Sequence, residues 1–217
     1  GLSPAKAGFI FLPAFHAKAP AHAINVAYTG RHESEMIFMK RGTTFRMVLT
    51  AMFASMICVA TMCVQIKSSM GGYVNLGDAL VLLGAFLLGA HGGAIAAGLG
   101  SALADLLSGY AHYAPGTLII KALCALAAAA LYRRLSKKSG MPRALSCVIS
   151  GLAGEAIMVV GYLFYAWVCL GRGAAAVASV PDNLAQAAAG IVIAAVLTPL
   201  TLRSDEIREF LEKYRKP

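Results

Sequence analysis

The fold is decided by residues 71–134, which read GGYVNLGDALVLLGAFLLGAHGGAIAAGLGSALADLLSGYAHYAPGTLIIKALCALAAAALYRR. This stretch contains three apolar segments, separated by short turns rich in Gly, Tyr and Pro. Four polar residues lie at or within the ends of the segments: Asn75, Asp78, Asp105 and Lys121. Charges inside helices of hydrocarbon length are costly and usually functional. We interpret the stretch as the wall and mouth of a small-molecule site in a helical membrane bundle.

The composition indicates a membrane protein with one domain. Of 217 residues, 59% are hydrophobic and only 13% are charged, whereas soluble domains carry about 25% charged residues. The predicted class is an all-α integral membrane bundle of six transmembrane helices. The expected spans are residues 46–66, 76–90, 94–109, 115–132, 144–170 and 183–202, with a loop over 67–78.

The regions outside the bundle are predicted to differ from it. Residues 1–39 hold three prolines and no apolar run long enough to cross a bilayer, so we expect a disordered or extraneous N-terminal extension. Residues 40–203 form the membrane domain, and residues 204–217 form a short charged cytoplasmic tail.

The distribution of basic residues predicts the orientation. Past residue 39, the side that holds both termini carries thirteen Lys and Arg residues, and the opposite loops carry Lys67 and Arg172 alone. Cytoplasmic loops are enriched in Lys and Arg, so both termini are expected in the cytoplasm. The net charge of +9 is therefore a topology signal and does not indicate a nucleic-acid partner.

Three charged residues inside the spans are candidates for the site. Asp105 and Lys121 are expected at similar depths, roughly 6 and 9 Å from the outer helix ends, which predicts an ion pair that either lines a pathway or only locks two helices together. Glu155 lies midway along its span. It is either a protonated core carboxyl or the floor of a polar cavity. We favour the floor, because Gly151 and Tyr162 share its helix face.

Signals for an enzyme or a metal site are weak. The sequence contains no HExxH, GxSxG or phosphate-loop motif, so no catalytic and no metal-binding residues are predicted. The five cysteines form no CxxC pair, and we interpret them as small buried hydrophobic residues.

The motifs NLGDA, GSALADLLSGYAHYAP and LIIK resemble the S components, the substrate-capture subunits of energy-coupling factor (ECF) transporters, and the likeness extends over residues 40–202. The resemblance implies six helices and an outward-facing vitamin pocket covered by loops. It also implies a scaffold transmembrane subunit and two cytoplasmic ATPases as partners, so ATP is used by those ATPases and no cofactor is expected in this chain. The expected location is the cytoplasmic membrane of a prokaryotic cell, as a multi-pass protein.

The family docks on its scaffold through an AxxxA step in the first helix, which corresponds here to Ala51 and Ser55. Spacing alone favours ordinary helix packing for this step. Under the resemblance, the ligand is a water-soluble vitamin or vitamin precursor. Six residues are expected to hydrogen-bond it: Asn75, Asp78, Tyr110, Glu155, Asn183 and Gln186. Asp105 and Lys121 would contact the ligand or brace the pocket.

Two alternatives come from other functional classes. A stand-alone transporter would use Glu155 as a proton carrier, and its uptake would depend on the proton gradient without ATPase partners. An intramembrane enzyme would use Asp78 and Asp105 as paired acids, which requires both carboxylates near one reacting atom.

Overall fold

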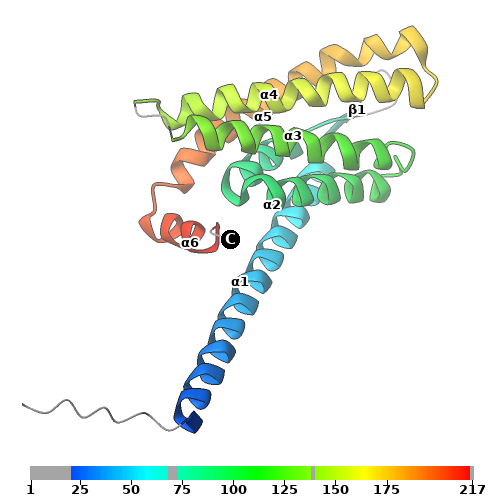
Figure 1. Ribbon diagram of the computed structural model, residues 1–217. Helices are drawn as coiled ribbons and strands as arrows, with labels where there is room; N and C mark the ends of the chain where they lie inside the picture. Colours follow the sequence, from blue (N-terminus) through cyan, green and yellow to red (C-terminus); the bar gives the residue numbers. More distant parts are fainter. Residues whose placement is uncertain (1–20, 68–72, 138–139, 216–217) are drawn as a thin grey trace, which may run out of the picture. The chain divides into compact units, whose positions relative to one another are not determined.

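The computed structural model describes residues 21–67, 73–137 and 140–215, and most of them are helical (Figure 1). The elements in chain order are α1 (Ala21–Cys63), β1 (Gln65–Lys67), β2 (Tyr73–Asn75), α2 (Gly77–Leu107), α3 (Ala114–Leu135), α4 (Arg143–Phe164), η1 (Tyr165–Cys169), η2 (Gly173–Ser179), α5 (Val180–Thr201) and α6 (Asp205–Arg215). Of the two short elements, η1 is a π-helix that extends α4, and η2 is a 3₁₀ helix that leads into α5.

The chain divides into two compact units, Gly1–Arg41 and Gly42–Pro217. Within the first unit, residues 1–20 lie outside the described residues. Residues 21–39 belong to helix α1, and the expectation that they form a disordered or extraneous extension stays a prediction. All three prolines behind that expectation lie at or before position 20, so none interrupts the helix.

Within the described residues, five helices are long and apolar enough to cross a membrane: Gly42–Cys63, Gly77–Leu107, Ala114–Leu135, Arg143–Cys169 and Gly173–Thr201. Four of them agree with spans expected from the sequence. The fifth, α2, combines the expected second and third spans into one element of 31 residues.

Helix α2 folds back on itself at Gly89. This residue has φ 80° and ψ −173°, a backbone conformation that is essentially restricted to glycine. Eight residues of straight helix span about 12 Å, yet a Cβ atom built on Gly93 would lie 2.6 Å from the Cα of Ala85. Residues 77–88 and 90–107 are therefore two arms that pack against each other. The expected spans 76–90 and 94–109 place the connection at residues 91–93, whereas the structure places the corner at Gly89.

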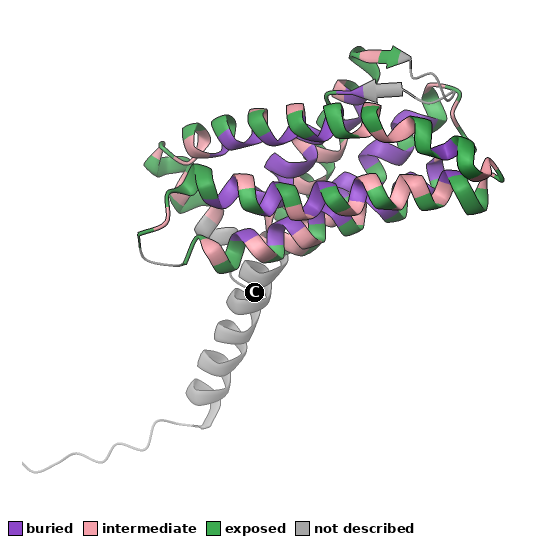
Figure 2. Ribbon diagram, turned by 90° about the horizontal axis from the view of Figure 1, so that it is seen from above, coloured by how far each residue is buried: buried purple, intermediate pink, exposed green. Residues whose placement is uncertain are grey.

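Small residues allow the helices of the second unit to approach closely. A Cβ atom on Gly100 of α2 would lie 2.5 Å from the carbonyl oxygen of Ala54 in α1, and one on Gly154 of α4 would lie 2.8 Å from that of Cys124 in α3. Buried residues gather on the helix faces that point into the bundle (Figure 2). The outer faces carry exposed Leu, Ile and Val, as expected for helices surrounded by lipid.

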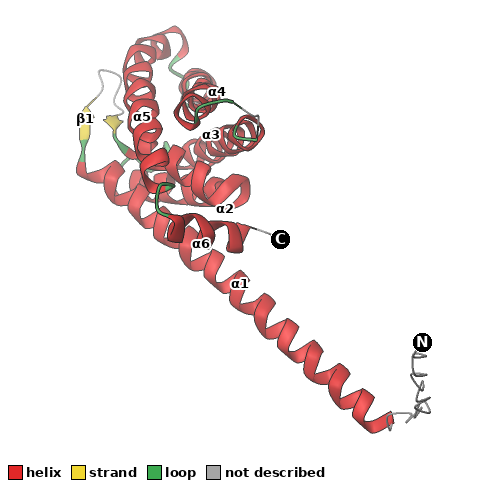
Figure 3. Cartoon of the chain, turned by 90° about the vertical axis from the view of Figure 1, so that its left-hand side faces the viewer, coloured by secondary structure: helices red, strands yellow, loops and turns green. Residues whose placement is uncertain are grey.

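A short β-hairpin joins α1 to α2 where the sequence predicted a loop. β1 and β2 are antiparallel, with Gln65 opposite Asn75, and Figure 3 shows them beside α5. The loop prediction is wrong for the described part, because residues 73–75 pair with 65–67; residues 68–72 lie outside the described residues. The Nε2 of Gln65 also donates a hydrogen bond of 2.8 Å to the Oγ of Ser108, which ties the hairpin to the end of α2.

Candidate functional site

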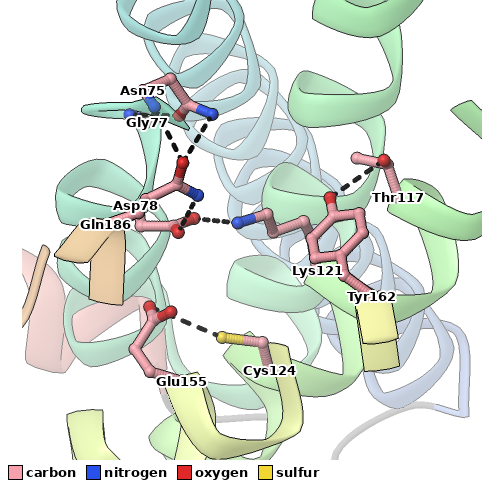
Figure 4. A network of polar contacts seen from close by, with 9 residues as sticks. All are labelled: Asn75, Gly77, Asp78, Thr117, Lys121, Cys124, Glu155, Tyr162 and Gln186. Carbon is pink, nitrogen blue, oxygen red and sulfur yellow. Dashed lines mark hydrogen bonds and ion pairs between the residues drawn. The ribbon is translucent and has the colours of Figure 1, made fainter. Parts of the chain in front are cut away.

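A buried ion pair between Asp78 and Lys121 forms the centre of the site (Figure 4). Asp78 lies in the first turn of α2, where the helix dipole favours a carboxylate, and Lys121 lies in the second turn of α3. Their side chains are 1% and 3% exposed. The sequence analysis predicted Lys121 to pair with Asp105, and this prediction is wrong. Asp105 lies near the end of α2, whereas the partner of Lys121, Asp78, lies at the start of this helix.

Gln186 of α5 extends the ion pair into a chain of hydrogen bonds. Its Nε2 donates to the Oδ2 of Asp78 at 2.6 Å, while its Oε1 accepts from the backbone N–H of Asn75 at 2.8 Å and from the Nδ2 of Asn75 at 3.3 Å. Lys121 donates to the other oxygen of Asp78. Both oxygens of Asp78 are therefore occupied by protein groups, which makes Asp78 a brace between α2, α3 and α5.

Asn75 connects the hairpin to α2. Its Oδ1 accepts a hydrogen bond of 2.8 Å from the backbone N–H of Gly77, one of the N–H groups that the first turn of a helix leaves without a partner. A Cβ atom on Gly77 would overlap the Oγ1 of Thr61 in α1. Only glycine therefore allows the start of α2 to lie against the end of α1.

Tyr162 of α4 lies beside Lys121 (Figure 4). Its hydroxyl donates a hydrogen bond of 2.9 Å to the Oγ1 of Thr117 in α3. The Nζ of Lys121 is 5.5 Å from the centre of the Tyr162 ring, within the distance of a cation–π interaction. Lys121 thus has an aromatic face and a carboxylate as neighbours.

These side chains surround a cavity of about 70 Å³ between the helices. The lining residues are Thr61, Asn75, Ser101, Asp105, Tyr113, Thr117, Lys121, Tyr162, Ala166, Ser179, Asp182, Asn183 and Gln186. Most of them are polar and they come from α1, the hairpin and every later membrane helix. The cavity lies at the hairpin end of the bundle, since it uses the end of α1, strand β2, the end of α2 and the start of α3.

Five of the eight residues predicted to bind ligand line this cavity: Asn75, Asp105, Lys121, Asn183 and Gln186. Asp78 lies behind it. Tyr110 belongs to the turn between α2 and α3 and is half-buried, with its ring 6.4 Å from that of His112. Neither residue is part of the lining.

Glu155 also differs from its prediction, because it does not form the floor of the cavity. It is 2% exposed, and its Oε1 accepts a long contact of 3.9 Å from the Sγ of Cys124. Within the described part of the chain, its Oε2 has no hydrogen-bond partner. Gly151 and Tyr162 do share the face of Glu155, but packing of α3 against α4 separates the carboxyl from the cavity.

The sequence analysis missed several hydroxyl groups of the lining, among them Thr61, Thr117 and Ser179. Thr61 is the most informative, because its buried Oγ1 lines the cavity and has no hydrogen-bond partner among the residues that the structure describes. A single Thr in an apolar helix carries no sequence signal, since its hydroxyl can usually bond to its own helix.

Tyr113 lines the cavity, and further aromatic and basic residues lie near it. The hydroxyl of Tyr165 donates a hydrogen bond of 2.8 Å to the backbone oxygen of His112, and the guanidinium of Arg172 lies 5.5 Å from the centre of the Tyr113 ring. Burial raises the pKa of Tyr113 above its ordinary value, although Arg172 opposes this shift. Tyr113 therefore stays a neutral phenol at physiological pH.

The fold and the site define an all-helical, multi-pass membrane protein with a polar cavity enclosed by its helices. Comparison with known families is more specific. The family described as "ECF-type riboflavin transporter, S component" matches residues 41–203, so the chain belongs to this family of membrane transport proteins. The family is a transporter component and not a class of enzyme.

A curated relative is found in Pyrococcus woesei. It is described as an uncharacterized protein in a gap 3' region, and it is 36% identical over 138 residues, which cover 63% of this chain and 88% of the relative.

Proposed function

We propose that this chain captures riboflavin, or a flavin of similar shape, at the polar cavity and delivers it to partner subunits for ATP-driven uptake. The observation that carries the proposal is the cavity itself, because a membrane bundle rarely encloses so many polar groups without a ligand or ion to bind. The family description names riboflavin, and the amide and hydroxyl groups of Asn75, Thr61 and Asn183 suit the donors and acceptors of a flavin ring.

Capture of such a ligand requires the lining to open. Pockets for small organic ligands measure about 300–1,000 Å³, whereas the cavity measures about 70 Å³. The hairpin, the turn after α2 and the segment from η1 to η2 surround it, and they are held by a few hydrogen bonds such as Gln65 to Ser108. We infer that movement of these connections admits the ligand.

The topology that accompanies this function has six spans with both termini in the cytoplasm. The two arms of α2 would each cross the membrane, and the shorter arm, about 18 Å long, would need local thinning or bundle neighbours. The hairpin and the cavity then face outward, in agreement with the charge distribution along the chain.

Docking on a scaffold subunit would use the outward face of α1. In the most apolar part of the first span, Gly42–Cys63, 11% of the residues are buried, compared with 33–56% for the other four spans. Ala51 and Ser55 are both exposed, and the Oγ of Ser55 donates to the backbone oxygen of Ala51 at 3.0 Å. Because the Ser55 hydroxyl is bonded to its own helix, the two small side chains leave room for a closely packed partner helix.

The two alternatives have less support. Paired acids would need Asp78 and Asp105 to share a reacting atom, but both oxygens of Asp78 bind Lys121 and Gln186. A proton carrier at Glu155 would need a water-filled path, and Glu155 does not line the cavity.

Flavin fluorescence tests the proposal directly. Addition of the purified full chain in detergent to riboflavin should quench the fluorescence with saturable, one-to-one stoichiometry. The Arg208→Gln variant, altered in α6 far from the cavity, should behave like the wild type. If riboflavin fluorescence is not quenched and a different vitamin shifts the melting temperature, that vitamin is the ligand and riboflavin is not. Absence of any response to a vitamin panel would count against a capture protein.

A further inference from the structure

One buried carboxyl has no role in the proposed function. Glu155 of α4 is 2% exposed and does not line the cavity. Its Oε1 accepts a long contact of 3.9 Å from the Sγ of Cys124, and its Oε2 has no hydrogen-bond partner among the residues that the structure describes. A buried acceptor without a donor is costly and rare in native proteins, so this carboxyl requires an explanation.

The packing of α3 against α4 places Glu155 near Lys121. Tyr162 of α4 bonds to Thr117 of α3. Seven residues away on each helix, Glu155 contacts Cys124, so the two helices are antiparallel and their register is fixed. Lys121 lies between these two contacts. It is three residues from Cys124 and four from Thr117, which corresponds to about 4.5 Å and 6 Å along the helix axis.

The ammonium of Lys121 has a neighbour at each of these levels. Its Nζ lies 5.5 Å from the centre of the Tyr162 ring, about one turn away in one direction, and Glu155 lies about one turn away in the other. Glu155 also acts on Lys121 electrostatically, in addition to Asp78. The ammonium carries three N–H donors on a flexible four-carbon stem, and it donates one of them to the Oδ1 of Asp78 (Figure 4).

We propose that Glu155 is a second counter-ion for Lys121, and that the ammonium exchanges Asp78 for Glu155 when the cavity takes up its ligand. One buried cation compensates one carboxylate, and a second buried carboxyl must then be neutral. Before the exchange, Asp78 holds the cation and Glu155 holds a proton. After it, the proton has passed from Glu155 to Asp78 and the ammonium has moved the other way, so the total buried charge is unchanged.

The exchange gives a ligand access to Asp78, and this consequence rests on the proposed function. Both oxygens of Asp78 are occupied by side chains that line the cavity, those of Lys121 and Gln186. When the ammonium turns to Glu155, one of these oxygens is released. A protonated carboxyl both donates and accepts hydrogen bonds, which suits a neutral ligand that presents the N–H and C=O of an amide or imide.

Infrared spectroscopy of the purified full chain in detergent tests the exchange without a ligand. Labelling with carbon-13 glutamate marks the carbonyl stretch of a protonated Glu side chain, and the band that Glu155→Gln removes belongs to Glu155. Asp78→Asn should remove the same band, because Lys121 then pairs with Glu155 as a carboxylate. The matched control, Asp105→Asn, changes another buried aspartate of α2 and should keep the band.

Thermal unfolding provides a second measurement on the same variants. Asp78→Asn and Glu155→Gln each leave Lys121 with one carboxylate, whereas the double variant leaves it with none. The loss of melting temperature in the double variant should exceed the sum of the two single losses at least about twofold. If the double variant does not fold, the infrared result for the single variants decides. A Glu155 band that persists in Asp78→Asn, no Glu155 band in the wild type, or additive losses would each overturn the proposal.

Addition of riboflavin to the labelled wild type separates the exchange from the proposed function. Binding should remove the Glu155 band, as Asp78→Asn does. If riboflavin quenching shows binding and the band stays, the exchange is wrong although the capture function stands. If neither riboflavin nor another vitamin binds, the capture function is wrong, and the Asp78→Asn spectrum still decides whether Glu155 is a counter-ion for Lys121.

Discussion

The two ends of the bundle enclose spaces that differ in volume and polarity. At the hairpin end, a cavity of about 70 Å³ is lined mainly by hydroxyl, amide and charged groups. At the α6 end, a groove of about 580 Å³ is lined mainly by apolar side chains with two arginines at its rim. The first end is closed by hydrogen bonds between its own residues, whereas at the second the rings of Phe45 and Phe210 pack against each other.

This difference shows where the bundle is held rigidly and where it is open to other molecules. Buried polar groups at the hairpin end must find partners, since an unpaired donor or acceptor costs about 1–3 kcal/mol, and the chain Lys121–Asp78–Gln186–Asn75 supplies them. The groove end relies on small residues and aromatic packing, which leave apolar surface for lipid or protein. The following predictions test this contrast, from the largest expected effect to the smallest.

Loss of one partner of the buried ion pair should be the most damaging change. Lys121→Met leaves Asp78 buried without its cation and should lower the free energy of unfolding by about 3–5 kcal/mol, measured by denaturation in detergent. The double variant Lys121→Met/Asp78→Asn should recover most of this loss. The control is Arg208→Gln at the α6 end. It breaks an exposed Arg208–Asp205 pair of 2.8 Å and should lower the free energy by less than about 1 kcal/mol. Equal losses of unfolding free energy in Lys121→Met and Arg208→Gln would show that the hairpin end depends no more on its ion pair than the α6 end does.

The corner of α2 should tolerate only glycine. Gly89→Ala places a side chain at φ 80° and should lower the free energy of unfolding by about 1–3 kcal/mol. Gly42→Ala is the matched control, because a Cβ atom there meets nothing within 4 Å; it should be neutral or slightly stabilising. A stable Gly89→Ala variant would show that the two arms do not depend on this corner.

Two hydroxyl groups of the cavity should separate binding from stability. Thr61→Val removes a hydroxyl that has no hydrogen-bond partner in the described part of the chain, so we expect riboflavin affinity to fall about tenfold with an unchanged melting temperature. Thr117→Val removes the acceptor of the Tyr162 hydroxyl and should lower both affinity and melting temperature. Fluorescence titration and thermal unfolding measure the two effects. If Thr61→Val binds riboflavin like the wild type, Thr61 is not a ligand contact.

The ionisation of Tyr113 should have the smallest effect. Burial raises its pKa in the folded state, so folding disfavours the phenolate, and stability from this group is complete below about pH 10 and decreases above it. Arg172 lowers the pKa of Tyr113, hence Arg172→Gln should raise it further. Ultraviolet absorbance of tyrosinate during alkaline titration, compared with a Tyr113→Phe variant, measures the shift. A titration of Tyr113 at or below the pH of free tyrosine would contradict the prediction.

Sequence reasoning was most successful for features that each segment determines locally. Apolar runs located the membrane helices to within a few residues, and the polar residues inside them proved to be buried. It was least successful for contacts between segments. The pairing of Lys121 with Asp78, and the separation of Glu155 from the cavity, depend on how far each helix is rotated about its axis, and spacing along one helix carries no information on its neighbour's rotation.

The sequence by itself determined that this chain is a membrane transport protein of the S-component family, because hydrophobic length and family motifs are properties of consecutive residues. Tertiary structure alone decided which polar groups become a brace and which remain available to a ligand. Asp78 and Asp105 are both aspartates near an end of α2, but only Asp78 meets Lys121 and Gln186. The reason is the fold of α2 at Gly89, which sets the relative positions of its two ends and thereby the partner of each carboxylate.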